Sequence, residues 1–445
     1  MRGMGLWRQS VCLAFVLLFL APGAACLGQG EQVPEWAYWF VHPPSSPLDL
    51  PIGSPVGLVT GDFNEDGNVD VIVFVQERPP STSTHSLEPE KVHVILLPGD
   101  GQGGFGAPIL VREVSKGTPW LVADVNEDGH LDLIVLSHHL VIEEERITEV
   151  RSEVQLMLGD GKGGLTEPQT LFELDGAVTD VALGDINRDG HMDLVVVNLS
   201  AVTVSVFLGD GTGGFAHHGT IELERQPLHV PYRATLGDWN HDGHLDLAIA
   251  GEIYEASDRR TRFVTVLLGD GSGLFEKTAF FIALEPPEED PPLWLNLIAV
   301  DYDGDGHLDL ITSRREMVIA LLGRGDGTFE KEELFSVIID PPPGIITLKI
   351  TLTDFNGDGC WDWVIPFYSV GWTALRVDVS DCGKFLGRTF WWSSGDEVIE
   401  ARVADLNNDG RPDVVYVTSY FDFAAGVRVT RVHWMLNNIP WEVGK

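Results

Sequence analysis

The sequence predicts an all-β fold, a single seven-bladed β-propeller whose blades are four-stranded antiparallel sheets. A nine-residue pattern rich in Asp and Gly recurs seven times, at intervals of 51 to 63 residues, the length of one supersecondary unit. Apolar runs of strand length flank each copy, and helical periodicity is absent. With 44% hydrophobic and 22% charged residues, the chain can bury a core, so its acidity does not indicate disorder.

The repeated pattern is Asp-x-Asn/Asp-x-Asp-Gly-x-x-Asp, and its positions are numbered one to nine throughout. Glycine occupies position six in every copy, and positions one, three, five and nine carry a carboxylate or amide. The copies span 62–70, 124–132, 185–193, 238–246, 301–309, 354–362 and 405–413. At about 59 residues per repeat they form one array over residues 34–445, and not a set of separate domains.

Each copy is expected to join the first two strands of a blade, as the first repeat illustrates. The apolar stretch 57–60 enters the loop, and the apolar run 71–75 leaves it as a strand buried on both faces. A third run leads into the glycine-rich turn 97–105, whose glycines permit positive φ in a hairpin. A weaker fourth strand follows at 108–111, and four strands per repeat are typical of a propeller blade.

Closure of the ring requires one blade that combines both chain ends, because an open array leaves sheet edges exposed. The outer strand of the last blade is expected to come either from the segment 36–41 or from the tail 439–443. The sequence leaves both choices open.

The nine-residue loop recurs in fixed order with the turn Gly-Asp-Gly-x-Gly-Gly-Phe, as at 209–215. This combination resembles the FG-GAP and VCBS repeat family, the calcium-loop β-propellers that include the integrin α-subunit head. The resemblance covers nearly the whole mature chain. It implies a propeller with calcium in its loops, and it says little about the partner.

Calcium takes six to eight oxygen ligands at about 2.3–2.6 Å, and side chains at positions one, three and five of a tight loop converge on one centre. Position seven can add its backbone carbonyl and position nine its carboxylate. Four copies carry histidine at position seven, where the carbonyl and not the ring would coordinate, which argues against zinc or copper in the loops. Up to seven Ca²⁺ ions are therefore predicted as cofactors. The predicted metal ligands are Asp62, Asn64, Asp66, Asn68, Asp70, Asp124, Asn126, Asp128, His130, Asp132, Asp185, Asn187, Asp189, His191, Asp193, Asp238, Asn240, Asp242, His244, Asp246, Asp301, Asp303, Asp305, His307, Asp309, Asp354, Asn356, Asp358, Cys360, Asp362, Asp405, Asn407, Asp409, Arg411 and Asp413.

The alternative interpretation of the loops is that Asp, Asn and Gly are common because they favour turns. A turn needs one or two such residues, whereas all seven copies fill every key position. These positions hold 22 of the 67 acidic residues. Two carboxylates about 4 Å apart repel by about 4 kcal/mol at an effective dielectric of 20, and a divalent ion would remove that repulsion.

The sixth repeat departs from the pattern. Cys360 and Trp361 stand inside its loop, and the segment 379–385 replaces the glycine turn. Because loop and turn lie at the same end of a blade, Cys360 and Cys382 can pair in an oxidising compartment. Two separate thiols are the alternative.

Residues 1–25 are interpreted as a signal peptide, with two arginines, the apolar run 11–20 and small residues at 23–25. The run is shorter than the roughly 20 residues that span a bilayer, and no later stretch reaches that length, so no transmembrane segment is predicted. The chain is expected to be secreted or held at the cell envelope. Cys26 is either a lipid-anchor site or a residue near ordinary secretory cleavage.

The net charge of −38 excludes nucleic-acid binding by phosphate neutralisation. The nucleophile-elbow, zinc-protease and Cys-x-x-Cys motifs are absent, so no catalytic residue and no enzymatic activity are predicted. The leading interpretation is a binding, adhesion or scaffold module for a protein or polysaccharide at the cell surface. Recognition is expected in the long loops 76–90, 137–153 and 251–262, at the end opposite the predicted metal loops. The alternatives are a carbohydrate-active propeller, either a lectin or a polysaccharide lyase, and a structural calcium store or surface-layer scaffold.

Overall fold

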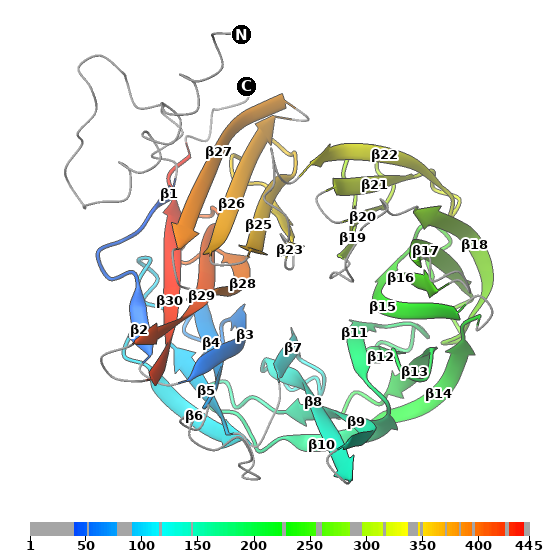
Figure 1. Ribbon diagram of the computed structural model, residues 1–445, viewed down its shortest axis with the longest axis horizontal. Helices are drawn as coiled ribbons and strands as arrows, with labels where there is room; N and C mark the ends of the chain where they lie inside the picture. Colours follow the sequence, from blue (N-terminus) through cyan, green and yellow to red (C-terminus); the bar gives the residue numbers. More distant parts are fainter. Residues whose placement is uncertain are drawn as a thin grey trace.

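The computed structural model describes residues 40–50, 53–77, 91–114, 118–143, 146–224, 228–254, 260–284, 296–314, 317–336, 346–347, 350–369, 372–381, 384–393, 397–422 and 427–439. The predicted signal peptide and Cys26 lie outside these residues, as does Cys382. Within them, the chain forms a seven-bladed β-propeller of antiparallel sheets, which confirms the predicted fold class (Figure 1).

The blades are numbered one to seven in the order of the seven repeats along the chain. Blade one contains β3 (Ser54–Gly61), β4 (Asp70–Gln76), β5 (Val92–Leu97) and β6 (Ile109–Val114), and blade two contains β7 (Thr118–Ala123), β8 (Asp132–Glu143), β9 (Arg146–Met157) and β10 (Gln169–Asp175). Blade three contains β11 (Val178–Gly184), β12 (Asp193–Asn198), β13 (Thr203–Gly209) and β14 (Phe215–Glu222), and blade four contains β15 (Leu228–Gly237), β16 (Asp246–Tyr254), β17 (Arg260–Gly269) and β18 (Phe275–Leu284). Blade five contains β19 (Leu297–Val300), β20 (Asp309–Arg314), β21 (Met317–Gly323) and β22 (Phe329–Ser336). Blade six contains β23 (Ile346–Thr347), β24 (Thr351–Thr353), β25 (Asp362–Ser369), β26 (Trp372–Asp381) and β27 (Lys384–Ser393), and blade seven contains β28 (Glu397–Ala404), β29 (Asp413–Asp422), β30 (Val427–Asn437), β1 (Phe40–Val41) and β2 (Leu48–Leu50).

The core lies between neighbouring blades, because the middle strands are buried on both faces. Every residue of β12 is buried, and so is all of β4 except its last residue, whereas the outer strand β6 is largely exposed. One core cluster, for example, joins Val73 and Leu97 of blade one to Trp434 of blade seven. Continuous apolar runs such as 71–75 therefore belong to strands sandwiched between two sheets.

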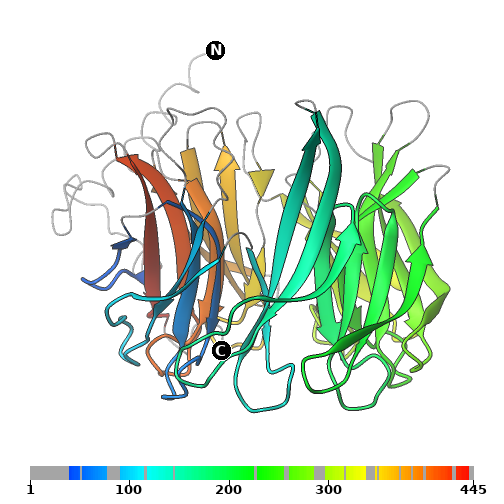
Figure 2. The ribbon, with the colours of Figure 1, turned by 90° about the horizontal axis from the view of Figure 1, so that it is seen from below.

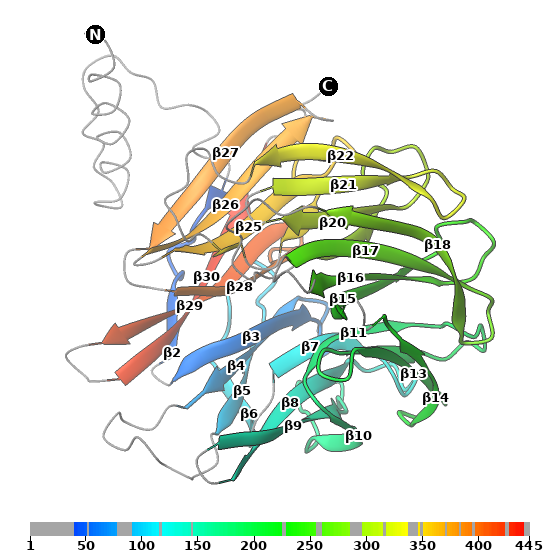
Figure 3. The same ribbon diagram turned by 45° about the vertical axis from the view of Figure 1, so that its right-hand side comes forward.

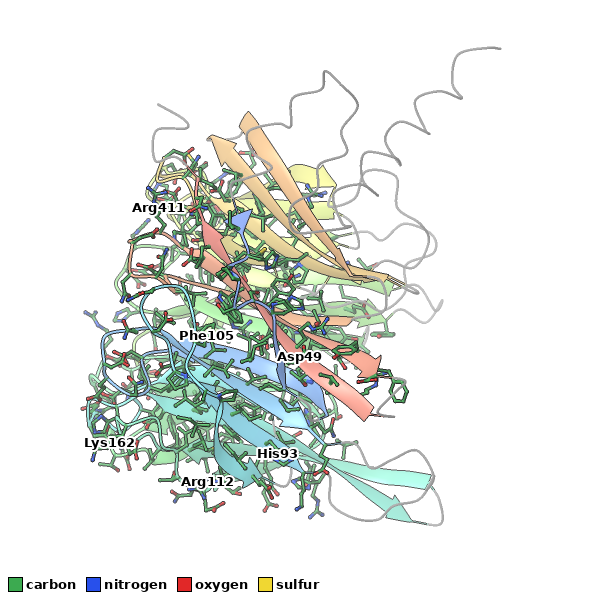
Figure 4. The ribbon with its side chains drawn as sticks, turned by 90° about the vertical axis from the view of Figure 1, so that its left-hand side faces the viewer. Asp49, His93, Phe105, Arg112, Lys162 and Arg411 are labelled. Carbon is green, nitrogen blue, oxygen red and sulfur yellow. The ribbon has the colours of Figure 1, made fainter. Side chains whose placement is uncertain are left out.

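Both chain ends build the last blade, and the N-terminal end supplies its outer edge. Phe40 pairs with Asn437, and β2 pairs with residues 430–432 of β30 (Figures 1 and 3). Asp49 on β2 accepts two hydrogen bonds from the guanidinium of Arg431, at 2.6 and 3.0 Å (Figure 4). Among the described residues, the N-terminal strands β1 and β2 therefore supply the edge that closes the ring; of the alternative segment 439–443, only Ile439 is described.

The innermost strands face the centre of the ring and also contact one another. A side chain from one such strand accepts a backbone N–H of the next: Glu400 from Leu58 at 2.9 Å, and Asp180 from Ala234 at 2.9 Å. β-Bulges interrupt the pairing of both strands that carry the accepting carboxylates, β28 and β11, beside these side chains. The bulges re-aim the side chains from the sheet towards the neighbouring blade.

The segment between the second and third strands of blade two differs from the sequence-based expectation of a loop over 137–153. It is a hairpin, because β8 continues to Glu143 and β9 begins at Arg146. Apolar β-branched residues such as Val141 and Ile142 explain why the strands continue. The hairpin projects beyond its neighbours at the end of the ring away from the nine-residue loops (Figure 2). No helix long and apolar enough to cross a membrane occurs in the described residues.

Candidate metal centres

All seven nine-residue loops lie within the described residues, and each joins the first two strands of its blade at one end of the ring. Figure 4 places Arg411 of the seventh loop and Lys162 of a glycine turn at this same end. The prediction that loops and turns share one end is confirmed.

The side chains at positions one, three and five fold each loop around itself. In the first loop, Asp62 accepts the backbone N–H groups of Asp66 and Gly67 at 3.1 and 2.9 Å. Asn64 accepts the same Asp66 N–H at 2.9 Å, and Asp66 accepts that of Asn68 at 2.9 Å. The other loops repeat these bonds within a few tenths of an ångström, except that in the fifth loop Asp301 accepts the N–H of Gly304 at 2.9 Å in place of the position-five N–H. The predicted ligand residues are thus held in one arrangement seven times.

The aspartate at position nine connects its loop to the turn between the third and fourth strands. Asp246 accepts the backbone N–H of Trp239 at 3.0 Å with one oxygen and that of Gly269 at 2.9 Å with the other. The side chain is fully buried, as is its counterpart in every blade. In blades six and seven, which lack the glycine turn, Ser380 and Asn437 supply the second N–H. Position nine is therefore a structural link in addition to a candidate ligand, a role that the sequence analysis did not identify.

Burial raises the pKa of every position-nine carboxyl above its ordinary value, and the two backbone hydrogen bonds oppose the shift only partly. The pKa of Asp246 rises to about 6, and the pKa values of Asp362 and Asp413 rise to about 7. The neighbouring aspartates at positions one and five add a smaller repulsion in the same direction. A nearby cation would reverse this balance, because it favours the charged form.

The fifth loop carries a cluster of three carboxylates. Among the described residues, Asp301, Asp303 and Asp309 form the one group of three or more His, Cys, Asp or Glu residues whose ligand atoms lie within 4.8 Å of one another. In the other six loops an asparagine stands at position three, and in five of them its amide donates to the position-five carboxylate, as from Asn240 to Asp242 at 2.9 Å. The fifth loop therefore concentrates the most negative charge.

The sixth loop keeps the common geometry despite its altered sequence. Asp354 accepts the N–H of Gly359 at 2.8 Å, and Cys360 donates its N–H to Asp358 at 2.8 Å. Cys360 is disulfide-bonded, so its sulfur is not a candidate ligand, and its backbone carbonyl keeps the predicted role. The expected partner, Cys382, lies outside the described residues, and this pairing stays a prediction.

Neighbouring loops touch through side chains at positions four and seven. Position four of one loop reaches position seven of the next in Glu65–His130, Glu127–His191, His241–His307 and Asn408–Asn68, the last of which joins loop seven to loop one. In each of these four junctions the position-seven side chain rests on a glycine of the adjacent turn: a Cβ at Gly211 would meet His191 at 2.4 Å. The fifth and sixth loops have glycine at position four and carry no such side chain. These four junctions link loops seven, one, two and three in series and loops four and five as a pair.

Comparison with known proteins identifies the repeat. The family model described as "FG-GAP-like repeat" matches residues 147–196 and 301–365. Two segments of this chain carry FG-GAP-like repeats. The matched segments contain the third, fifth and sixth loops, so the resemblance inferred from the loop and turn is confirmed.

Individual relatives are distant. Human cartilage acidic protein 1 is 29% identical over 157 residues, which are 35% of this chain and 23% of that protein; the chain thus spans about a quarter of that relative's length. Among solved structures, the BBS1N chain of a complex with ARL6DN has a TM-score of 0.50 at 10% identity, covering 91% of this chain and 99% of that one. An Agrocybe aegerita lectin that recognises non-reducing terminal N-acetylglucosamine has a TM-score of 0.45 at 17% identity, covering 79% and 90%. The likeness to BBS1N shows a shared fold and no more.

Proposed function

We propose that this FG-GAP-repeat propeller is an exported, non-enzymatic binding module whose seven loops hold Ca²⁺ and whose rigid ring presents one face to a macromolecular partner at the cell surface. The observation that carries the proposal is the sevenfold recurrence of one loop geometry, with oxygen side chains at positions one, three, five and nine. Turn formation alone does not require four such side chains per loop.

The donor set fits calcium. Oxygens bound to one Ca²⁺ at about 2.4 Å stand at most about 4.8 Å apart, and the carboxylates of Asp301, Asp303 and Asp309 meet that limit. The donors are carboxylate, amide and backbone oxygens, which hard cations prefer to the softer transition metals. Each carboxylate oxygen that accepts one backbone N–H keeps further lone-pair capacity for an ion.

Bound calcium would supply positive charge that neutralises the converging carboxylates of a loop. The chain's own residues then determine what the charge stabilises. Position one holds the N–H groups of positions five and six, and position nine joins the loop to the neighbouring turn. The position-two side chains, such as Trp239 and Phe355, are buried between blades. A loop held in place therefore also holds a blade boundary.

Metal content and thermal stability test this proposal. Protein dialysed against calcium buffer is expected to retain several calcium atoms per chain by elemental analysis, and chelation is expected to lower the melting temperature. One site contributes up to about 2.7 kcal/mol at free calcium one hundred times its dissociation constant. No bound alkaline-earth metal, together with identical melting in EDTA and in millimolar calcium, would reject the calcium role.

The partner is tested separately. Capture of one protein from envelope extracts, with no signal on a glycan array and no cleavage of polysaccharides, supports the binding-module proposal. Saturable glycan binding or release of unsaturated sugar ends would instead assign the chain to the carbohydrate-active class. The fold-level precedent is the BBS1N propeller, which was crystallised with a protein partner.

A further inference from the structure

The junction between the fourth and fifth loops differs in chemistry from the others. His241 at position four and His307 at position seven face each other, with Nε2 and Nδ1 2.7 Å apart and ring centroids 4.9 Å apart. Glu65–His130 and Glu127–His191 pair a carboxylate with an imidazole, and Asn408–Asn68 pairs two amides. The fourth–fifth junction instead joins two imidazole nitrogens by a hydrogen bond.

From this geometry we propose that His241 and His307 bind one divalent transition metal of the imidazole-preferring class, best represented by Cu²⁺, across the boundary between blades four and five. Imidazole nitrogens suit Cu²⁺, Ni²⁺ and Zn²⁺, and among these Cu²⁺ binds most strongly. Two nitrogens held at about 2.0 Å from one tetragonal ion stand about 2.8 Å apart when adjacent. The observed 2.7 Å is close to that separation, so an ion replaces the hydrogen bond between the two nitrogens once the side chains rotate to turn both rings towards it.

The surroundings support one of the two imidazole rings and leave the other accessible to solvent. His307 is half-buried and rests on Gly325, where a Cβ would lie 2.5 Å from the imidazole Nδ1. His241 is exposed, so water can reach the open coordination positions. Its backbone φ of 57° fixes the direction of the side chain in a left-handed conformation. Together these contacts hold one ring and leave the other accessible.

This site is separate from the calcium proposal. Calcium would use oxygen atoms inside the loop, including the backbone carbonyl of His307, whereas the transition metal uses ring nitrogens outside it. The argument from all-oxygen ligation excludes copper and zinc from the loops themselves and does not apply to the junction. Nitrogen ligation can therefore be measured in excess calcium.

The test is titration of the full chain with Cu²⁺ in excess Ca²⁺, followed by calorimetry and electron paramagnetic resonance. The wild type is expected to bind one Cu²⁺ more tightly than any other copper on the chain, with hyperfine splitting from two imidazole nitrogens. The double variant His241→Asn/His307→Asn is expected to weaken this binding at least about tenfold and to lose the splitting. It recreates the Asn–Asn pair of the seventh–first junction, so hydrogen bonding can persist there.

His244→Asn is the matched control, because His244 also occupies position seven but no histidine stands at position four of the preceding loop. Asparagine at position 241 suits the left-handed backbone, since Asn408 has φ 56° at the same loop position. Equal Cu²⁺ binding by the wild type and the double variant, or equal loss in His244→Asn, overturns the proposal. Thermal melting of each variant in calcium confirms that it is folded.

Discussion

Replacing Asp246 by asparagine separates the structural role of position nine from its candidate role as a ligand. Both oxygens of Asp246 accept buried backbone N–H groups, from Trp239 at 3.0 Å and from Gly269 at 2.9 Å. Asparagine keeps one acceptor and turns an NH₂ group towards the other N–H. The substitution therefore leaves one buried donor without an acceptor, whether or not an ion is bound.

The buried N–H without an acceptor determines the expected loss in the free energy of unfolding. A buried N–H without a partner costs about 1–3 kcal/mol, and Asp246→Asn is expected to lose this amount in EDTA. In calcium the loss grows by up to about 2.7 kcal/mol, the contribution of one site at one hundred times its dissociation constant. The control is Asp242→Asn at exposed position five, where water replaces the lost hydrogen bonds. It is expected to be near neutral in EDTA and destabilised in calcium.

Urea unfolding followed by tryptophan fluorescence at pH 8 measures both variants in both conditions. The pH lies above the pKa of about 6 that burial gives Asp246, so the wild-type carboxyl is ionised. If Asp246→Asn unfolds like the wild type in EDTA, the hydrogen-bonded link between loop and turn contributes nothing, and that reasoning is wrong. If Asp242→Asn is insensitive to calcium, the negative charge at position five contributes nothing to calcium binding.

Three further predictions test other parts of the ring. Apparent calcium affinity is expected to rise with pH between about 5.5 and 7.5, because the ion must displace protons from Asp362 and Asp413, whose pKa values burial raises to about 7. In calcium-free protein, pH has the opposite effect on the free energy of unfolding. Between the ordinary pKa of 3.8 and about 7, these two carboxyls bind more protons in the folded state than in the unfolded state, so stability falls as the pH rises through that window. A calcium affinity and a free energy of unfolding that do not change with pH contradict the two effects. Gly103→Ala is expected to lower the free energy of unfolding about 1–3 kcal/mol more than Gly67→Ala. Both glycines have φ near 85°, but of the two only Gly103 has a neighbour that a Cβ would meet, Leu436 at 2.6 Å. Equal losses of stability in urea unfolding contradict this close approach. Finally, Glu127→Gln is expected to lower the pKa of His191, which the hydrogen bond to Glu127 raises; an unchanged NMR titration of His191 shows that the junction does not form in solution.

The blades could be predicted because the information lies within each repeat. The loop pattern, the apolar run after it and the glycine turn recur in fixed order, so one unit such as residues 57–111 defines the whole ring. The buried middle strands followed from uninterrupted apolar runs, as in β4. The choice between the two closing segments did not follow, because each is a short apolar stretch and only pairing with β30 distinguishes them.

The features that the sequence did not predict are contacts that form only when the blades are folded and packed together. The position-four side chains look like variable loop residues: Glu65, His241 and Asn408 share no chemistry. Their common feature is a left-handed backbone, with φ from 56 to 57°, that turns each towards the next loop. Position nine looked like the last ligand of a cage, and its second partner, 14 to 29 residues further along the chain, appears only after the blade folds. The sequence does show part of this link, because in blades one to five a glycine at the start of the turn donates the N–H to position nine.

The position-two carbonyl of each loop shows why the loop and the turn occur together. In blades one, four and seven this carbonyl accepts an N–H from the glycine turn of the following blade, as Phe63 does from Gly163 at 2.8 Å. Blade seven has no glycine turn, yet Asn437 at the same place donates its side-chain amide to the carbonyl of Phe355 at 2.8 Å. Its backbone N–H meanwhile bonds to position nine of its own blade at 2.7 Å. One residue thus replaces two glycine contacts, which indicates that the bond to the neighbouring loop, and not glycine itself, is what the ring requires. Loops one, four, six and seven are consequently fixed by their own blade and by the next, so disturbing one of them is expected to loosen a blade boundary.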